Sequence, residues 1–376
     1  MAKKQPEAAK PLFVAPSLET KDILALVGSV QEALKGELVV IKDVSQFIST
    51  GIPQLDIIMG GGVPVGRLTT FQGAESTGKS SIGYRVLAEA QRMGGAAAVQ
   101  DVERSAWYKR CVLMGLDMDH LIASQPDTLD TYSYKRPDGV EVTKLGVFDT
   151  IERLLWVIRE KAPQVLFANL VDSIAGSSVA REMEREVGKG TMGNHSLVTS
   201  QGLRKLMAYV SDYNLALIFI NQIKKKVGVM FGDDDTTIAE KPIGYHSSII
   251  VKLARAGFYP KDTKDQAIVT RAYVSKNKVA PPFRTCTFRV FFDRGIDTLF
   301  EDIECLEQYG ELGGETGWVA FGGKKMRKQE LYFRAKNDVD LYAQIHETTG
   351  KLVKEVIDGT RPFERKSKKE EVAAAA

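Results

Sequence analysis

The chain has 376 residues, of which 44% are hydrophobic and 26% charged, the composition of an ordinary globular protein. Its length allows one large domain or two to three modules, and its net charge of +3 excludes a uniformly basic surface. No run of 18 apolar residues and no secretory signal occurs, so no membrane span is expected. Cys111, Cys286 and Cys305 are too far apart to suggest a disulfide framework or metal cluster, which favours a reducing cytoplasm.

Residues 1–17 are rich in Lys, Pro and Ala and are expected to be disordered. From about Leu18 to residue 36, apolar residues recur at helical spacings. This helix is too small to form its own core, so we expect it to dock on another surface, for which a neighbouring subunit is a candidate. Glycines and prolines in residues 49–67 then predict turns around one short helix.

The run from Gly73 to Ser80 fits the phosphate-loop pattern G-x-x-x-x-G-K-[ST]. A β-type run at 68–72 precedes it and a helical pattern at 81–92 follows, which favours a nucleotide site over a Gly/Ser-rich turn before an ordinary helix. Lys79 is expected to reach the β- and γ-phosphates of ATP, and the Ser80 hydroxyl to bind Mg²⁺. The loop residues expected to contact ATP are Gly73, Glu75, Ser76, Thr77, Gly78, Lys79, Ser80 and Ser81.

Further apolar runs end in polar residues, and the intervals between them are long enough for crossover helices. This alternation predicts an α/β fold with a mainly parallel sheet. The polar residues follow the carboxyl ends of the strands, the edge at which open α/β sheets bind ligands. The runs are 96–100, ending at Asp101 and Glu103; 165–171, ending at Asp172 and Ser173; and 215–220, ending at Asn221 and Gln222.

Two carboxylates at this edge suit ATP hydrolysis. Asp172 closes an apolar strand, as does the Walker B carboxylate that holds Mg²⁺ through water opposite the phosphate-loop hydroxyl. The alternative for Asp172 is a cap on the next helix. Glu103 is a candidate for the base that orients the attacking water, and its alternative is a surface charge.

Two polar segments after these strands look unsuited to packing in a core. Residues 181–193 mix charges with glycines. In residues 223–237, Lys224, Lys225 and Lys226 precede an apolar group that includes Met230 and Phe231. Cations that track phosphates beside apolar groups that wedge between bases suit single-stranded nucleic acid. The alternative for the second segment is a β-hairpin or a partner contact.

Taken together, these blocks resemble the RecA-type homologous recombinases from about Ser49 to about Val356. Their order and spacing are more specific than any one of them. They are Leu55-Asp-Ile57 before Gly66-Arg67, the phosphate loop, Ser124-Gln-Pro-Asp-Thr128, Val171-Asp-Ser-Ile-Ala175, Phe219-Ile-Asn-Gln-Ile223 with Val227-Gly-Val-Met-Phe-Gly232, Lys276-Asn-Lys278 with Ala280-Pro281 and Pro282-Phe283, and Gly295-Ile296.

The resemblance implies a RecA-type P-loop ATPase core with a mainly parallel central sheet, a short N-terminal helix and a small α/β C-terminal module. It implies ATP- and Mg²⁺-dependent assembly of a helical filament on single-stranded DNA, with DNA-stimulated hydrolysis, homologous pairing and strand exchange. The implied partners are single-stranded and double-stranded DNA, further copies of the chain, and single-strand-binding and mediator proteins. The implied setting is the cytoplasm of a bacterium or of a phage-infected host, away from membranes.

By motif position, Glu103 matches the family's catalytic glutamate and Gln222 its γ-phosphate sensor. Lys276 and Lys278 match lysines that reach the ATP of the neighbouring subunit, where two cations serve as an arginine finger does; their alternative is solvated charge on a strand. Tyr245 matches an aromatic residue involved in coupling along the filament. The positions matched to DNA contacts are Met192, Gly193, Ser200, Arg204, Lys224, Lys226, Val227, Met230 and Phe231.

The chain also departs from the family pattern. Leu197 replaces one of two arginines on the helix after the first loop, and Ala239-Glu240 replaces a Gly-Gly pair after the second. Arg110 stands where an aromatic residue is expected against adenine, with Trp107 or Tyr108 as possible substitutes. The tail after Arg361 is mixed and basic rather than acidic. Such drift would suit a bacteriophage-encoded member.

The expected domain organisation has four parts, and the third carries a cluster of basic residues that we expect to gather duplex DNA. Its alternative is an ordinary solvated face. The basic residues are Lys324, Lys325, Arg327, Lys328, Arg334 and Lys336. The parts are residues 1–37, a tail and an oligomerisation helix; 38–300, an ATPase core with DNA-binding loops at about 181–193 and 222–243; 301–358, the C-terminal module; and 359–376, a tail.

Two competing functions use the same motifs. A RecA-fold motor or switch, such as a ring helicase of the DnaB kind or a KaiC-like ATPase, would share the nucleotide site. A ring helicase, however, should carry a primase-binding N-terminal domain and an arginine finger instead of Lys276 and Lys278. A scaffold that binds ATP without hydrolysing it should lack Glu103, which is present.

Overall fold

The computed structural model divides the chain into two units, residues 1–43 and 44–376. In the first unit only Ala25, Ser29 and Glu32 are described, and all three are helical. The remainder of the expected N-terminal helix lies outside the described residues, and its docking stays a prediction. In the second unit the described residues are 44–106, 108–183, 194–210, 213–225, 235–237, 239–261, 266–313 and 317–363.

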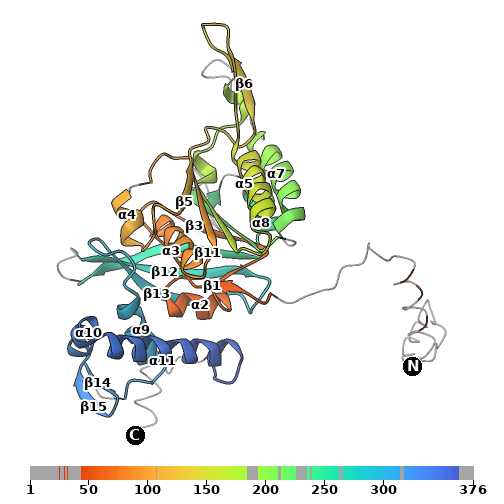
Figure 1. Ribbon diagram of the computed structural model, residues 1–376. Coiled ribbons are helices and arrows are strands. Elements are labelled where there is room, and N and C mark those ends of the chain that lie inside the picture. The colour runs from red at the N-terminus through yellow and green to blue at the C-terminus, as the bar shows by residue number, and fades with distance from the viewer. Residues whose placement is uncertain are drawn as a thin grey trace, which may run out of the picture. The chain divides into compact units, whose positions relative to one another are not determined.

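The second unit is built on a large central sheet of strand order β13-β12-β11-β3-β9-β8-β4-β5 (Figure 1). From β11 to β5 neighbouring strands are parallel, whereas β11, β12 and β13 form an antiparallel meander. The predicted α/β fold with a mainly parallel sheet is confirmed. The strands are β3 (Arg67–Gly73), β4 (Ala96–Asp101), β5 (Leu121–Ser124), β8 (Phe167–Asp172), β9 (Leu215–Lys225), β11 (Ile249–Tyr259), β12 (Ala267–Asn277) and β13 (Thr285–Phe291).

Both faces of the sheet are buried, because alternate residues of each strand enter different cores. In β9, Ile218 belongs to a core with helix α3 (Lys79–Arg92), while Phe219 belongs to a core with the helices of the other face. Burial on both faces explains why the strands appear in the sequence as continuous apolar runs. The remaining core helices are α2 (Pro53–Met59), α4 (Tyr108–Leu113), α5 (Val147–Lys161), the 3₁₀ turn η1 (Ile174–Gly176), α6 (Ala180–Met183), α7 (Asn194–Val210) and α8 (Glu240–His246).

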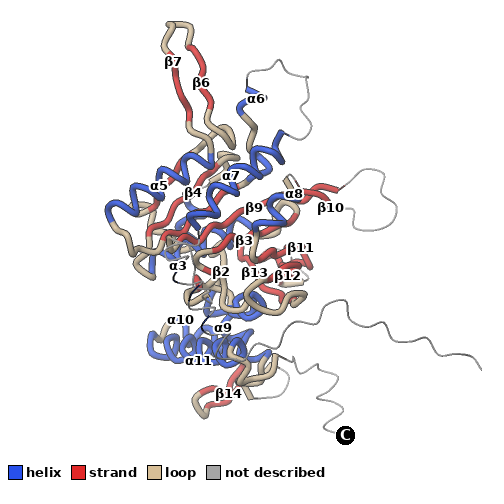
Figure 2. The backbone as a smooth tube through the Cα atoms, turned by 90° about the vertical axis from the view of Figure 1, so that its right-hand side faces the viewer, coloured by secondary structure: helices blue, strands red, loops and turns tan. Residues whose placement is uncertain are grey.

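Short two-stranded pairings flank this core. A hairpin of β6 (Tyr132–Lys135) and β7 (Glu141–Lys144) projects away from the central sheet in both views (Figures 1 and 2). The other pairings are β1 (Phe47–Ile48) with β2 (Val63–Pro64), and β10 (Asp235–Thr237) with the end of β9. No helix among the described residues is long and apolar enough to cross a membrane.

A C-terminal module packs on α2 through a third apolar core that includes Ile57, Ile303 and Leu352. The boundary expected between residues 300 and 301 stays a prediction, and helix α9 extends across it. The module consists of α9 (Thr298–Gln308), β14 (Trp318–Phe321), β15 (Lys324–Arg327), α10 (Lys328–Lys336) and α11 (Val339–Ile357).

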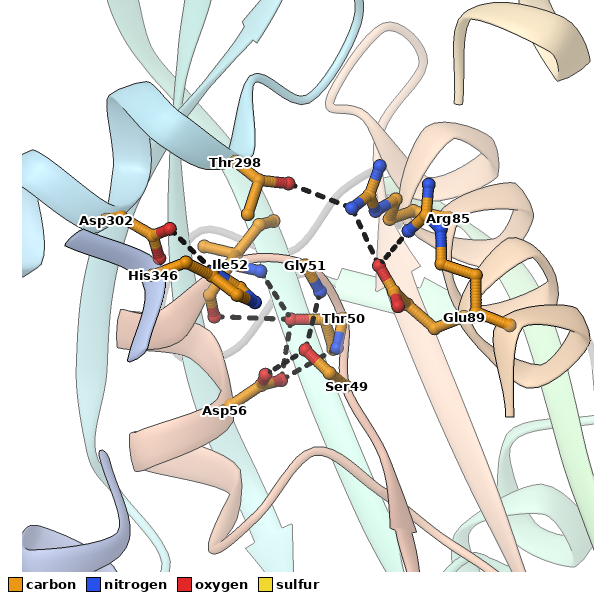
Figure 3. A network of polar contacts seen from close by, with 11 residues as sticks. Ser49, Thr50, Gly51, Ile52, Asp56, Arg85, Glu89, Thr298, Asp302 and His346 are labelled. Carbon is orange, nitrogen blue, oxygen red and sulfur yellow. Dashed lines mark hydrogen bonds and ion pairs between the residues drawn. The ribbon is translucent and has the colours of Figure 1, made fainter. Parts of the chain in front are cut away.

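Polar contacts close the seam between the module and the core (Figure 3). Asp56, on α2, accepts hydrogen bonds from the Ser49 hydroxyl at 2.5 Å, the Thr50 amide at 2.9 Å and the Thr50 hydroxyl at 2.7 Å. Across the seam, Arg85 donates to the Thr298 hydroxyl at 2.9 Å, and within the module His346 lies 2.8 Å from Asp302. Helices from distant parts of the sequence are thereby fixed against one another.

Candidate nucleotide and DNA site

The phosphate loop joins β3 to α3, as predicted from its flanks. Gly78 has φ 89°, a left-handed conformation that favours glycine, and it leads directly into the first turn of α3. The Thr77 hydroxyl donates to the Ala74 carbonyl at 2.8 Å, and Lys79 Nζ donates to the same carbonyl at 2.5 Å. The lysine head therefore lies over the loop in which a phosphate would be held.

Lys79 is largely buried, and this burial lowers the pKa of its ammonium group. The nearby charges of Asp172, Glu103 and Glu75 oppose that shift. One cation thus shares its surroundings with three acidic side chains from separate segments. A phosphate placed here would meet a cation whose charge is not fully neutralised by a close ion pair.

Asp172 ends β8 and is buried, with its Oδ2 lacking a hydrogen-bond partner among the described residues. Burial raises the pKa of Asp172 to about 6, and a hydrogen bond from Ser80 partly offsets that shift. A hydroxyl and a carboxylate oxygen with spare acceptor capacity form a donor set that suits Mg²⁺, which prefers oxygen and keeps several waters. The residues present therefore fit the expected metal ion.

Glu103 follows β4, the neighbour of β8 in the sheet, and Asp101 is in register with Asp172. The Glu103 carboxylate accepts a hydrogen bond from the Ser173 hydroxyl, and Glu103 as a residue is exposed. Gly176 leaves room for it, because a Cβ there would lie 2.6 Å from Glu103 Cγ. Glu103 is thus held at the edge of the sheet beside Asp172 and can reach water.

Asp101 holds the turn that carries Glu103, a role that the sequence did not single out. Its side chain accepts hydrogen bonds from the amides of Ser105 and Ala106 and from Gln125 Nε2 at 3.1 Å. The signal was visible, since Asp101 is the first polar residue after an apolar strand. The sequence does not indicate that the Asp101 carboxylate points back into its own loop.

Gln222 lies in β9 directly opposite Gly73, the last residue of β3. Its Nε2 donates to Oε1 of Glu75 in the phosphate loop at 2.9 Å. The expected γ-phosphate sensor therefore touches the loop that would hold the phosphates. This hydrogen bond joins the phosphate loop to β9, from which the second polar segment continues.

A cavity of about 370 Å³ opens beside the phosphate loop and extends along α3. Arg110 lines it and donates to the Ser81 hydroxyl at 2.8 Å, whereas Tyr108 is exposed and does not line it. Trp107 lies outside the described residues. The aromatic and apolar surfaces that line this cavity, which the sequence did not identify, belong to Tyr84, Ile268, Val290 and Phe292.

Lys276 and Lys278 are displaced from this chain's own phosphate loop in the register of the sheet. Lys276 pairs with Ile250, which pairs with Thr70 in the middle of β3, three residues before Gly73. Lys276 Nζ donates to the Gly244 carbonyl at 2.5 Å, and its pKa is lowered by burial and by Lys278. The exposed Tyr245 lies at the same place, and its carbonyl is 3.3 Å from Lys276 Nζ.

The second polar segment begins differently from the expectation. The strand that we expected to end at Ile220 continues to Lys225 and pairs with β10, so Ile223, Lys224 and Lys225 face Thr237, Thr236 and Asp235. The base of the segment is therefore an antiparallel pairing of β9 with β10, and DNA binding by the segment stays a prediction. Ala239, where the family has glycine, adopts a left-handed φ of 52°.

The other positions expected to contact DNA are described only in part. On α7, Arg204 donates to the Ser200 hydroxyl at 3.3 Å, and Leu197 is exposed. Both polar side chains are near the surface, where a phosphate could replace their mutual contact. Six of the expected positions lie outside the described residues: Met192, Gly193, Lys226, Val227, Met230 and Phe231. For Lys224 only the backbone is described.

The basic cluster of the C-terminal module is partly neutralised. Lys328 forms ion pairs with Glu304 at 2.6 Å and Glu307 at 2.7 Å, and Arg334 pairs with Glu330 at 2.5 Å. The adjoining strand β15 carries Lys324, Lys325 and Arg327, and Arg327 lies over the ring of Trp318 on β14. Duplex binding by this surface stays a prediction.

Comparison with known proteins agrees with this geometry. A model of the RecA N-terminal domain matches residues 33–297. Protein RecA of Thioalkalivibrio sulfidiphilus is 32% identical over 90% of this chain and 91% of its own length. Protein RecA of Legionella pneumophila strain Corby is 34% identical over 82% and 80%, and that of Chlorobium chlorochromatii 32% over 84% and 83%. The chain therefore belongs to the RecA family.

Proposed function

We propose that this chain is an ATP-dependent recombinase that forms filaments on single-stranded DNA and catalyses homologous pairing and strand exchange. In this proposal DNA stimulates ATP hydrolysis, and Mg²⁺ accompanies the nucleotide. Membership of the RecA family supports the general activity. The proposal of DNA-stimulated hydrolysis and strand exchange depends on how the nucleotide site is connected to the segments expected to bind DNA.

The observation that carries the proposal is the hydrogen bond from Gln222 to Glu75. Gln222 begins the segment of lysines and apolar residues expected to bind DNA, and Glu75 belongs to the loop expected to bind phosphates. A residue that begins one functional segment therefore contacts the other. Binding at one can change the free energy of binding at the other, and such coupling is reciprocal.

For hydrolysis, Glu103 orients the attacking water and accepts its proton. It is exposed to solvent, lies beside the strand that ends at Asp172, and is steadied by the Ser173 hydroxyl. Lys79 balances charge on the phosphates. Ser80 and Asp172 would hold Mg²⁺, which when bound neutralises part of the negative charge on the β- and γ-phosphates.

Lys276 and Lys278 complete the site of a neighbouring subunit rather than that of their own. Their register on β12 separates them from the loop that follows β3, so a reach to the phosphates within one chain is disfavoured. Lys276 instead caps carbonyl groups at the end of α8 beside the exposed Tyr245. A filament that stacks subunits would place these side chains on the next nucleotide.

The test is an ATPase assay with and without single-stranded DNA, together with electron micrographs of the same samples. We expect DNA to raise the hydrolysis rate, and filaments to require both DNA and nucleotide. Lys79→Ala provides the control, since it removes the phosphate contact and should abolish both effects. Unstimulated hydrolysis by closed rings would favour the motor alternative and contradict the proposal.

A further inference from the structure

The β6–β7 hairpin is an exposed element that the sequence motifs did not single out. Its strands pair with Tyr132 opposite Lys144 and Tyr134 opposite Val142, and the Arg136 amide donates to the Val140 carbonyl at 2.9 Å. The hairpin projects from the core in two perpendicular views (Figures 1 and 2). Residues 133–141 of the hairpin are exposed, so a partner can reach their side chains.

The two faces of this hairpin differ in chemistry. Side chains opposite one another in register share a face, and alternate residues of a strand face the same way. The tyrosine rings of Tyr132 and Tyr134 stack with centroids 6.0 Å apart. We call the first group the aromatic face: Tyr132, Tyr134, Arg136, Val140, Val142 and Lys144. The polar face consists of Ser133, Lys135, Glu141 and Thr143.

The distal part of the aromatic face is open to solvent. Tyr134 is 41% exposed and Val140 is 51% exposed. Arg136 is also exposed, and its pairing with Asp138 spans 3.4 Å at the surface. Such exposed ion pairs contribute little, so a phosphate can take the place of Asp138. None of the six residues of this face is acidic, although Asp127 contacts Tyr132 and Lys144 at its base. An exposed aromatic ring beside a cation matches the chemistry of single-stranded nucleic acid.

The base of the hairpin is fixed to the segment that leads into the first polar loop. The Leu129 amide donates to the Ser178 carbonyl at 2.9 Å, and the Ala180 amide donates to Asp130 Oδ1 at 2.7 Å. Ala180 begins α6, which Figure 2 shows on the same side of the core as the hairpin. The hairpin is therefore fixed to α6, the last described element before the first expected DNA-binding segment.

Asp127 ties the hairpin to the catalytic edge as well. Its Oδ1 lies 2.5 Å from the Arg104 guanidinium, and its Oδ2 lies 2.5 Å from Lys144 Nζ. Arg104 directly follows Glu103 and has a left-handed φ of 54°. The cations on Asp127 hold the pKa of its carboxyl below the usual range, and the hydrogen bond from Lys144 is the main cause. The hairpin is thus anchored at both ends of its stem.

We propose that the aromatic face of the β6–β7 hairpin is a third contact for single-stranded DNA, in which a base stacks on Tyr134 and a phosphate pairs with Arg136. This inference rests on the proposed function, because it extends the path of the same DNA strand. It differs in using an element outside both expected loops. The occupant is one strand of DNA, and a second copy of the chain is the competing outcome.

The experiment compares neighbouring residues on opposite faces. Arg136→Ala and Lys135→Ala each remove one exposed cation, but only Arg136 lies on the aromatic face. Affinity for a fluorescein-labelled oligodeoxythymidylate is measured by anisotropy across salt concentrations, with a non-hydrolysable ATP analogue. We expect Arg136→Ala to reduce the slope of log affinity against log salt by about 0.7, the value for one phosphate on a single strand, and Lys135→Ala to leave it unchanged.

Tyr134→Ala tests stacking, with Thr143→Ala on the polar face as its control. A lost stack should weaken binding between about 5-fold and about 150-fold, and the control should bind as the parent does. An oligonucleotide carrying 5-iodouracil should crosslink to Tyr134 on irradiation, with the site read by mass spectrometry. Circular dichroism and nucleotide affinity are measured on every variant to separate these effects from misfolding.

The outcomes are distinguishable. If the parent binds DNA but Arg136→Ala and Tyr134→Ala match their controls, the hairpin inference is wrong while the proposed function stands. If Tyr134→Ala instead impairs self-assembly without DNA and leaves the salt slope intact, the face binds another copy of the chain, and the inference is again wrong. If the parent itself binds no DNA, the proposed function fails and the inference fails with it.

Discussion

Two buried aspartates, one at the carboxyl edge of the sheet and one at the seam below it, show what separates a site from a scaffold. Asp172 and Asp56 are 2% and 5% exposed, and burial raises the pKa of both, to about 6 and about 7. Asp56 accepts hydrogen bonds from Ser49 and Thr50 on both of its oxygens (Figure 3). Asp172 has an oxygen without a hydrogen-bond partner among the described residues, beside Lys79.

The difference lies in hydrogen bonding rather than in burial or pKa. A buried carboxylate with its acceptors filled stabilises the loop that fills them, whereas spare acceptor capacity next to a cavity leaves room for an external ligand. The comparison predicts that substitutions at the sheet edge change nucleotide chemistry and that those at the seam change stability. Substitutions at Glu103 and Asp172 therefore report on the sheet edge, and substitutions at Asp56 report on the seam.

The largest effect should come from Glu103→Gln, because it removes the base without altering the shape of the site. We expect kcat for ATP hydrolysis to fall by about 10²–10⁴-fold, with the affinity for a fluorescent ATP analogue retained. Glu160→Gln, on an exposed part of α5, is the matched control and should behave as the parent does. Hydrolysis by Glu103→Gln at the parental rate would remove this residue from the catalytic role.

Alanine at the two aspartates should separate stability from binding. Asp56→Ala leaves the Ser49 hydroxyl and the donors of Thr50 without their acceptor and should reduce the free energy of unfolding by about 3 kcal/mol. Asp172→Ala should change it by less than about 1 kcal/mol but weaken binding of Mg²⁺-ATP. Urea denaturation measures the stability of both variants, and titration measures their nucleotide affinity. A large loss of stability in Asp172→Ala with weakened nucleotide binding in Asp56→Ala would refute the comparison.

The seam should also respond to pH through Asp56. Its pKa of about 7 in the folded chain exceeds the ordinary 3.8, because burial and the charge of Glu89 outweigh the hydrogen bonds of Ser49 and Thr50. Folding thus favours the protonated form, and this stabilisation is complete below about pH 4 and lost as pH rises through 7. Relative to Asp56→Asn, the parent should lose stability over that window, at most about 1.4 kcal/mol per pH unit. Parallel pH profiles would contradict this.

The smallest predicted effect concerns the contact between Glu75 and Gln222. Both side chains are near the surface, so their hydrogen bond should contribute only about 1 kcal/mol. A double-mutant cycle with Glu75→Ala and Gln222→Ala, read as affinity for an ATP analogue in the presence of single-stranded DNA, isolates that coupling. Strict additivity of the two substitutions would show that the contact transmits nothing.

Much of the fold could be predicted from the sequence, because apolar runs, glycine placement and crossover lengths are local properties. The phosphate loop and the strand ends at Asp101 and Asp172 follow from such patterns. The strand after Ile220 was misjudged, because its lysines lie in a two-stranded extension whose pairing with β10 is not visible in local hydrophobicity.

Other features depend on which distant segments meet. No local pattern indicates that Phe292 and Tyr84 line the cavity beside the phosphate loop, since one follows β13 and the other lies on α3. The orientation of the Asp101 carboxylate and the partner of Gln222 likewise depend on register across the sheet. Such contacts follow from tertiary packing, and residue spacing alone does not fix them.

The central claim is that nucleotide binding and DNA binding are coupled, and DNA affinity in two nucleotide states tests it most directly. Anisotropy with a labelled single strand is measured at one fixed salt concentration, once with a non-hydrolysable ATP analogue and once with ADP. We predict binding about 5- to 150-fold tighter with the ATP analogue, the range of a typical coupling free energy. Equal affinity in the two states would contradict the account.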